Sequence, residues 1–169
     1  AILFKADSLN KNGEYVAKDR TISIIVATQK GVAIERYEDL KSLSAVGIFR
    51  SGSVSPKFDS DKVIKKHSVS NYTNLVQMLG VSRLDAIVGN SVVITTLIDQ
   101  LCLQDKIEVS PLVMGSSEQW LVLSKKSVHL NQAKKLQSAV QSLKQDGVLD
   151  KIFDAHLSHN QQNCNQKNK

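Results

Sequence analysis

Two stretches decide how this chain of 169 residues folds: residues 37–58 (YEDLKSLSAVGIFRSGSVSPKF) and residues 82–91 (SRLDAIVGNS). Each contains a short apolar strand that is followed by small polar residues at the start of a helix. Unpaired backbone N–H groups at a helix N-terminus attract anions and polar groups. Ligands of doubly wound sheets lie beyond the carboxyl ends of the strands. The sequence therefore predicts a solute site with these candidate residues: Arg50, Ser51, Gly52, Ser53, Asn90 and Ser91.

Strands alternate with helices along most of the chain, which is typical of an α/β fold with a mostly parallel sheet. Strands are predicted at residues 21–27, 45–49, 68–70, 84–88, 107–113 and 119–124. Helices are predicted at residues 37–43, 55–66, 72–79, 91–103, 132–146 and 148–157. The candidate linkers are residues 11–13 and 115–118.

Capping residues predict where several of these helices begin and end. Ser55 followed by Pro56 predicts one helix start, and Asn71 and Asn131 predict two more. Gly147 is expected to end the long helix. Apolar residues recur at helical spacing in three predicted helices: Tyr72, Leu75, Val76 and Leu79, then Val93, Leu97 and Leu101, then Ala133, Leu136, Val140 and Leu143. In the last helix, Ile152 and Phe153 are expected to face inward.

The composition is that of an ordinary globular protein, with 41% hydrophobic and 22% charged residues. The net charge is +6, but the lysines are scattered and form no basic stripe with interleaved aromatic residues. We therefore expect no nucleic-acid partner. No apolar run is long enough to span a bilayer. The polar end of the chain, residues 158–169, is predicted to be a disordered tail.

Two cysteines, Cys102 and Cys164, have neither metal-ligand nor redox spacing. Cys102 lies in the apolar pattern of a helix and is expected to be a buried small hydrophobe. The sequence does not indicate a disulfide between the two, and it leaves the redox compartment open.

Each candidate site residue also has a purely structural interpretation. Residues 51–53 fit an ordinary strand-to-helix turn, Arg50 fits a solvated surface, and Ser91 fits a helix cap. Asp85 is expected to tie a turn or to pair with Arg83. Tyr72 and Trp120 could form aromatic walls, although both residue types occur more often in a core.

An enzyme has little support in this sequence. The histidines are dispersed without metal-ligand spacing, and neither a nucleophile elbow nor a phosphate-binding loop occurs. We expect binding without catalysis, and neither a cofactor nor a metal.

Five segments in order resemble motifs of the type 2 periplasmic solute-binding proteins, in particular the family 3-like proteins that bind amino acids. The segment LKQDGVLDKI at residues 143–152 is the most specific of them. The others are residues 37–41, 46–53, 72–88 and 121–126. The resemblance extends over residues 21–157, which is most of the chain.

The resemblance implies two hinged lobes with the solute between them. Residues 1–34 would be a remnant of the first lobe and a hinge strand, and residues 35–114 the second lobe. Residues 115–157 would be the returning hinge strand and the C-terminal helices. Most of the first lobe is missing from this pattern, so we expect a fragment or a reduced chain whose C-terminal helices expose an apolar face.

One departure from the family concerns the ligand. Where the amino-acid binders often place an aspartate after the fourth predicted strand, this chain has Asn90, or Ser91 with a shift of one residue. An amide supplies no countercharge for an ammonium, so the α-amino-acid class of ligand is in doubt.

The resemblance implies a protein that binds a small polar solute, either an amino-acid-like molecule or another organic anion. It would serve an ABC-type uptake system or a membrane sensor in the periplasm, and a homodimer is a further hypothesis. Two alternatives are the effector-binding domain of a transcriptional regulator and, if the first lobe is absent, a protein-interaction domain.

Overall fold

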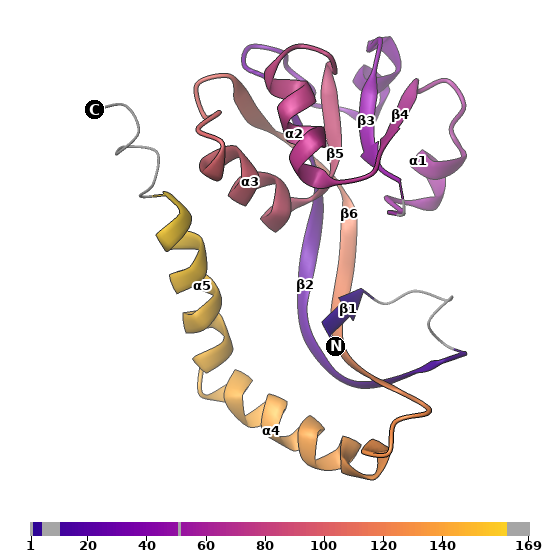
Figure 1. Ribbon diagram of the computed structural model, residues 1–169. Helices are drawn as coiled ribbons and strands as arrows, with labels where there is room; N and C mark the ends of the chain where they lie inside the picture. Colours follow the sequence, from indigo (N-terminus) through magenta and orange to yellow (C-terminus); the bar gives the residue numbers. More distant parts are fainter. Residues whose placement is uncertain (1, 5–10, 51, 162–169) are drawn as a thin grey trace. The chain divides into compact units, whose positions relative to one another are not determined.

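The computed structural model describes residues 2–4, 11–50 and 52–161, with side chains for residues 11–50 and 52–155. The chain divides into two compact units. The flanking unit takes residues 1–22 and 116–158, and the central unit takes residues 23–115 and 159–169. Two long strands, β2 (Gly13–Gln29) and β6 (Ile107–Ser124), run from one unit into the other (Figure 1).

Hydrogen bonds connect the strands in the order β1-β6-β2-β5-β3-β4. In the central unit, β3 (Val46–Phe49) pairs in parallel with both β4 (Lys66–Val69) and β5 (Ala86–Asn90). Strand β2 pairs with β5 in the antiparallel direction, with Val26 opposite Val88. The α/β class is thus confirmed, and the parallel pairing is that of β4, β3 and β5.

The sheet of the central unit is buried on both faces. Residues alternate along β2 and β5, so that Ile25 and Ile87 enter one apolar cluster while Val26 and Val88 enter the other. Helices α2 (Tyr72–Gly80) and α3 (Ser91–Gln100) cover the first face (Figure 1). The short helices η2 (Tyr37–Ser42) and α1 (Pro56–Ser60) pack on the second.

Capping residues determine where α1 and α2 begin, as the sequence predicts. The side chain of Ser55 accepts a hydrogen bond from the Phe58 N–H at 3.3 Å, and that of Asn71 accepts one from the Asn74 N–H at 2.7 Å. Helix α1 ends earlier than predicted, because the Asp61 carboxylate accepts the Val63 N–H and the chain becomes extended there.

Helix α3 also differs from its prediction. Its buried residues are Ile94 and Ile98, whereas Leu97 and Leu101 are only partly buried against that cluster and Val93 does not belong to it. The helix ends at Gln100 instead of residue 103, and Cys102 has a positive φ of 55°.

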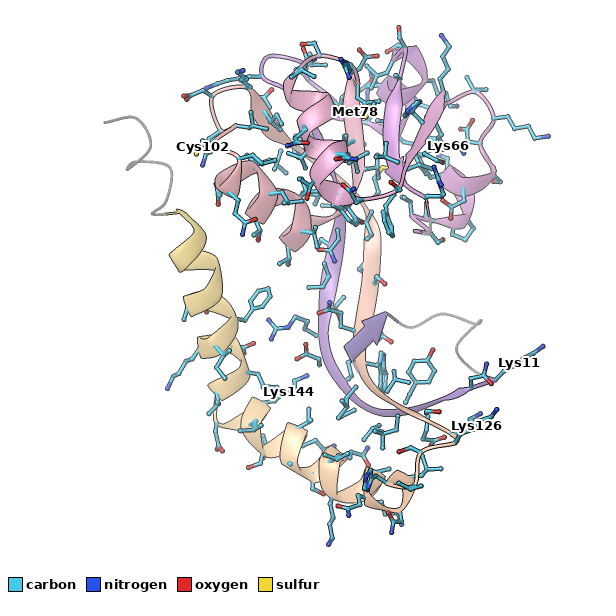
Figure 2. The ribbon with its side chains drawn as sticks, viewed as in Figure 1. Lys11, Lys66, Met78, Cys102, Lys126 and Lys144 are labelled. Carbon is cyan, nitrogen blue, oxygen red and sulfur yellow. The ribbon has the colours of Figure 1, made fainter. Side chains whose placement is uncertain are left out.

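In the flanking unit, β1 (Ile2–Phe4) pairs antiparallel with β6. A 3-10 turn, η3 (Leu130–Gln132), leads into α4 (Ala133–Gln145), and α5 (Val148–Gln161) follows. The guanidinium of Arg20 lies 3.8 Å from the ring centre of Phe153, and the Lys144 ammonium donates to the Lys18 carbonyl at 3.1 Å (Figure 2). Gly147 ends α4 as predicted, with φ of 67°.

Helix α4 has no buried residue. The apolar side chains of Leu136, Leu143 and Ile152 are 37%, 39% and 63% exposed. An exposed apolar face on the C-terminal helices is thus confirmed, but the prediction that Ile152 faces inward is wrong.

The candidate linker at residues 115–118 lies within β6, and the chain passes from the central to the flanking unit between residues 115 and 116. Two further predictions are wrong. Asn131 caps no helix, because it lies inside η3 and α4 begins after Gln132 without a side-chain cap. Cys102 is disulfide-bonded. Cys164 lies outside the described residues. Of the predicted disordered tail, residues 158–161 belong to α5, and residues 162–169 also lie outside the described part.

Candidate functional site

The carboxyl ends of β3 and β5 bring the predicted site residues to one edge of the central sheet. The parallel register pairs Ile48 with Val88, so Arg50 and Asn90 occupy equivalent positions two residues further on. Helices α2 and α3 begin at the same edge, directly after Asn71 and Asn90 (Figure 1). Such an edge exposes helix N–H groups beyond parallel strands, where polar solutes bind in α/β proteins.

Asn90 is almost fully buried, with 5% of its surface exposed. Its side-chain oxygen accepts the Val93 N–H at 3.1 Å and so caps α3. Its backbone N–H donates to the Tyr72 hydroxyl at 3.3 Å. The capping role that the sequence assigned to Ser91 as an alternative thus belongs to Asn90, and Ser91 becomes the first residue of the helix.

Tyr72 forms part of this edge. Its ring stacks on Phe49, with ring centres 5.0 Å apart and an interplanar angle of 20°. Burial raises the pKa of the Tyr72 phenol, an effect that the Asn90 N–H partly offsets, so the hydroxyl is neutral at physiological pH. A Cβ at Gly89 would lie 2.8 Å from this ring, so the glycine is what lets the tyrosine reach Asn90.

Arg50 is exposed, and its backbone N–H donates to the Val69 carbonyl at 2.9 Å. The Gly52 N–H is used within a turn, donating to the Phe49 carbonyl at 3.0 Å. The Ser53 hydroxyl donates to Asp59 at 2.6 Å. Ser51 lies outside the described residues. Gly52 and Ser53 therefore serve the turn that the sequence offered as their alternative role, and Arg50 and Asn90 remain the stronger candidates for solute contact.

Two other residues have the structural roles that the sequence allowed. The Asp85 carboxylate accepts the backbone N–H groups of Ser44 and Ala45, at 2.6 and 2.9 Å, and so ties a turn. Trp120 lies in the flanking unit, where its ring meets that of Tyr15 edge-on, with ring centres 5.8 Å apart.

The sequence-based prediction missed two residues that contribute to this edge, Phe49 and Asp59. Phe49 is the last residue of a predicted strand, and this position could have indicated that it lies at the edge of the sheet.

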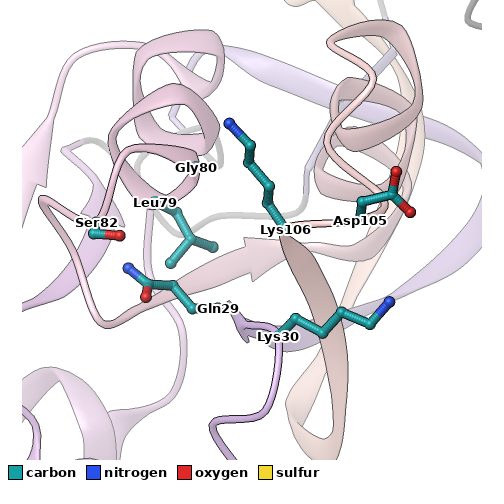
Figure 3. Close-up of a pocket in the computed structure, with 7 residues that line it drawn as sticks. All are labelled: Gln29, Lys30, Leu79, Gly80, Ser82, Asp105 and Lys106. Atoms are coloured by element: carbon teal, nitrogen blue, oxygen red, sulfur yellow. The ribbon is translucent and has the colours of Figure 1, made fainter.

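A hollow of about 400 Å³ lies at the opposite end of the central sheet. Its polar lining includes Gln29, Lys30, Ser82, Asp105 and Lys106 (Figure 3). Gln29 follows Thr28, which pairs with the first residue of β5, so this hollow is separated from Asn90 by the length of that strand. Among the residues with described side chains, no group of three or more metal-ligating residues could hold an ion.

Solved structures share this architecture. AbpA, an amino acid ABC transporter substrate-binding protein from Streptococcus pneumoniae bound to L-arginine, matches with a TM-score of 0.77 and 19% identity over 94% of this chain. A mutant of ArgBP from T. maritima matches with a TM-score of 0.75 and 16% identity over 92%. The chain has the fold of type 2 periplasmic solute-binding proteins.

A third structure with this solute-binding fold is the periplasmic VFT2 domain of BvgS from Bordetella pertussis, with a TM-score of 0.69 and 15% identity over 88% of this chain. The chain spans 66% of the length of ArgBP and of AbpA, and 63% of the BvgS domain. No family model and no curated protein matches the sequence. Within the described residues, no helix is both long and apolar enough to cross a membrane.

Proposed function

We propose that this chain binds a small polar solute, at the edge formed by the ends of β3 and β5, for an ABC-type uptake system or a membrane sensor. The observation that carries the proposal is the convergence of Arg50, Tyr72 and Asn90 at the starts of two helices. The solute-binding fold of the neighbours supports it. The chain would act by binding alone, without catalysis.

Domain motion would couple binding to a membrane partner. Strands β2 and β6 pass between the two units at residues 22–23 and 115–116, and Gly115 has a φ of 151° at the second crossing. We propose these crossings as the hinge. A bound solute shifts the population toward a closed state only if it binds that state more tightly.

We place the protein in the periplasm. Disulfides persist in oxidising compartments and are rare in reducing ones, so the disulfide bond of Cys102 supports this location. Alkylation of the protein as its source cell makes it would test the location. A free thiol at Cys102 in the native protein would contradict it.

Two arginines of the central unit allow a matched test of the site. Arg50 and Arg83 are both exposed, but Arg83 precedes β5 and lies at the end of the sheet opposite Asn90. A panel of polar solutes would be screened by the thermal unfolding of the protein, because a ligand at a hundred times its Kd stabilises by about 2.7 kcal/mol. We expect Arg50→Ala to weaken the response and Arg83→Ala to preserve it. Equal responses from both variants would contradict the site.

We propose that a second copy of the chain covers the exposed side chains of Leu136 and Leu143 on α4. Apolar side chains gathered on one exposed helix favour such an interface. Light scattering after size-exclusion chromatography should show a dimer, and monomers over a wide range of concentration would contradict it.

A further inference from the structure

We propose that the edge around Asn90 selects solutes that carry a carboxylate but no neighbouring ammonium group, and that Asn90 determines this specificity. The proposal rests on the proposed function and concerns the chemical class of the solute. The proposed specificity follows from the hydrogen-bonding groups of the edge that are not used in bonds within the protein.

The orientation of the Asn90 amide is set by the helix that it caps. Its oxygen accepts the Val93 N–H at 3.1 Å, so the amide presents its NH2 group on the other side. Among the described residues, this NH2 group has no acceptor. The described part of the chain also contains no buried side-chain nitrogen or oxygen without a partner. The NH2 group must therefore reach the surface, although only 5% of Asn90 is exposed.

The described residues of the edge also lack a carboxylate that is not already hydrogen-bonded within the protein. The only acidic residue in the described segments that form the edge (residues 49–50, 52–59, 69–74 and 88–94) is Asp59. The carboxylate of Asp59 is already engaged, because one oxygen accepts the Ser53 hydroxyl at 2.6 Å and the other accepts the Val54 N–H at 3.2 Å. A solute ammonium at this edge would find no unused carboxylate.

The amide and charged side chains that the edge presents to a solute are donors, and a tyrosine hydroxyl beside them can donate as well. They are the Asn90 NH2 group, the neutral hydroxyl of Tyr72, whose oxygen already accepts the Asn90 N–H, and the exposed guanidinium of Arg50. A carboxylate, which only accepts, matches this set, and an arginine adds a charge-assisted bond. An ammonium beside that carboxylate would be desolvated without compensation.

Matched pairs of solutes would test the specificity directly. L-glutamate and glutarate, L-aspartate and succinate, and L-alanine and propionate each differ by the amino group. Titrations of the 15N-labelled, unreduced protein measure the affinity for each member. They are followed through the backbone amide resonances of residue 90 and its neighbours, which the wild type and the variant at this position share. We expect the member without the amine to bind at least about tenfold more tightly in at least one pair.

Asn90→Asp is the matched variant, because aspartate caps helices as well as asparagine does and so keeps α3 intact. Its carboxylate supplies the missing countercharge, and we expect it to shift the preference toward the amine-bearing members by about tenfold or more. An unchanged preference would overturn the role of Asn90.

The outcomes separate this inference from the proposed function. Tighter binding of the amino acid in every pair that binds would overturn the inference and leave solute binding in place. If no member of any pair shifted the resonances of Asn90 or of its neighbours, both would fail.

Discussion

The central and flanking units bury their residues very differently. The central unit has a sheet covered on both faces, with Leu75, Leu79 and Phe58 fully buried. In the flanking unit, four apolar residues are buried among those described, all of them on β2 and β6: Val16, Ala17, Ile22 and Val122. Helix α4 contributes none.

This difference shows which part of the chain is stabilised by its own core. Burying a large apolar side chain contributes about 1.5–3 kcal/mol, so the central unit gains most of its stability from β2, β3, β5 and the helices against them. The flanking unit depends on a ribbon of strands, a cation–π contact of Arg20 and surface hydrogen bonds. The candidate site lies on the well-packed unit, where side chains are held in place.

Truncation of matched leucines should give the largest contrast between the units. Leu79 on α2 is fully buried, whereas Leu136 on α4 is 37% exposed. We expect Leu79→Ala to lower the free energy of unfolding by about 2–5 kcal/mol, and Leu136→Ala to change it by less than about 1 kcal/mol, because little cavity forms there. Urea unfolding followed by circular dichroism measures both. An equal loss in the two variants would mean that α4 is buried in solution.

Two glycines should respond to alanine for different reasons. At Gly89 the new Cβ would lie 2.8 Å from Cε1 and 2.9 Å from the hydroxyl of Tyr72, so Gly89→Ala should cost about 1–3 kcal/mol by overpacking. It should also move Tyr72 away from the Asn90 N–H and weaken solute binding.

Gly147 in the flanking unit has open space around its Cα but a φ of 67°. Gly147→Ala should therefore cost about 1 kcal/mol from backbone strain alone, and Gly147→Asn should cost less, because asparagine tolerates this conformation. Urea unfolding distinguishes the two causes. A Gly147→Asn variant as unstable as Gly147→Ala would contradict the backbone explanation.

The sequence predicted the central unit well because local chemistry and packing agree there. Caps at Ser55 and Asn71 and the apolar face of α2 each identify an element that the core then uses. The prediction failed where a local signal had no such support. Asn131 has the right residue type for a cap, but the chain enters α4 through a 3-10 turn instead. The small polar residues around Gly115 predicted a linker, and the chain does pass between the units there. The sequence did not show that β6 continues through them, because strand pairing is decided by distant segments.

The candidate site was predictable in position but not in detail. The ends of β3 and β5 follow from the apolar runs, and the parallel register then places Arg50 beside Asn90. Contacts between segments decide which hydrogen-bonding groups remain available to a solute. Examples are the bonds of Ser53 with Asp59 and of Tyr72 with Asn90. No spacing rule in the sequence reveals those bonds.

Helix caps offer a smaller contrast of the same kind. The Asn71 side chain accepts the Asn74 N–H at 2.7 Å, and Asn71→Ala should destabilise the protein by about 1 kcal/mol. Asn131→Ala removes the same side chain from a position where it makes no cap, and the expected change is within about 0.5 kcal/mol. A shift in the urea midpoint for Asn131→Ala as large as that for Asn71→Ala would contradict the cap assignment.

The smallest effect concerns pH and the bond between Tyr37 and Asp61, both in the central unit. The Tyr37 hydroxyl donates to the Asp61 carboxylate at 2.9 Å. Burial and, next, this bond raise the pKa of Tyr37 from 10.0 to about 12. A pKa that is raised on folding contributes stability that is fully present below pH 10 and is lost as the pH rises toward 12.

The difference in urea midpoint between the wild type and Tyr37→Phe isolates this contribution. The difference should be constant from neutral pH to pH 10 and should shrink as the pH rises from 10 to 12. Deprotonation of Tyr37 removes the bond from the wild type, and the variant lacks the hydroxyl at every pH. Tyr15→Phe, in the flanking unit, is the matched control. It should retain the alkaline loss of the wild type, and a Tyr37→Phe variant that also retained it in full would show that the bond to Asp61 contributes nothing in solution.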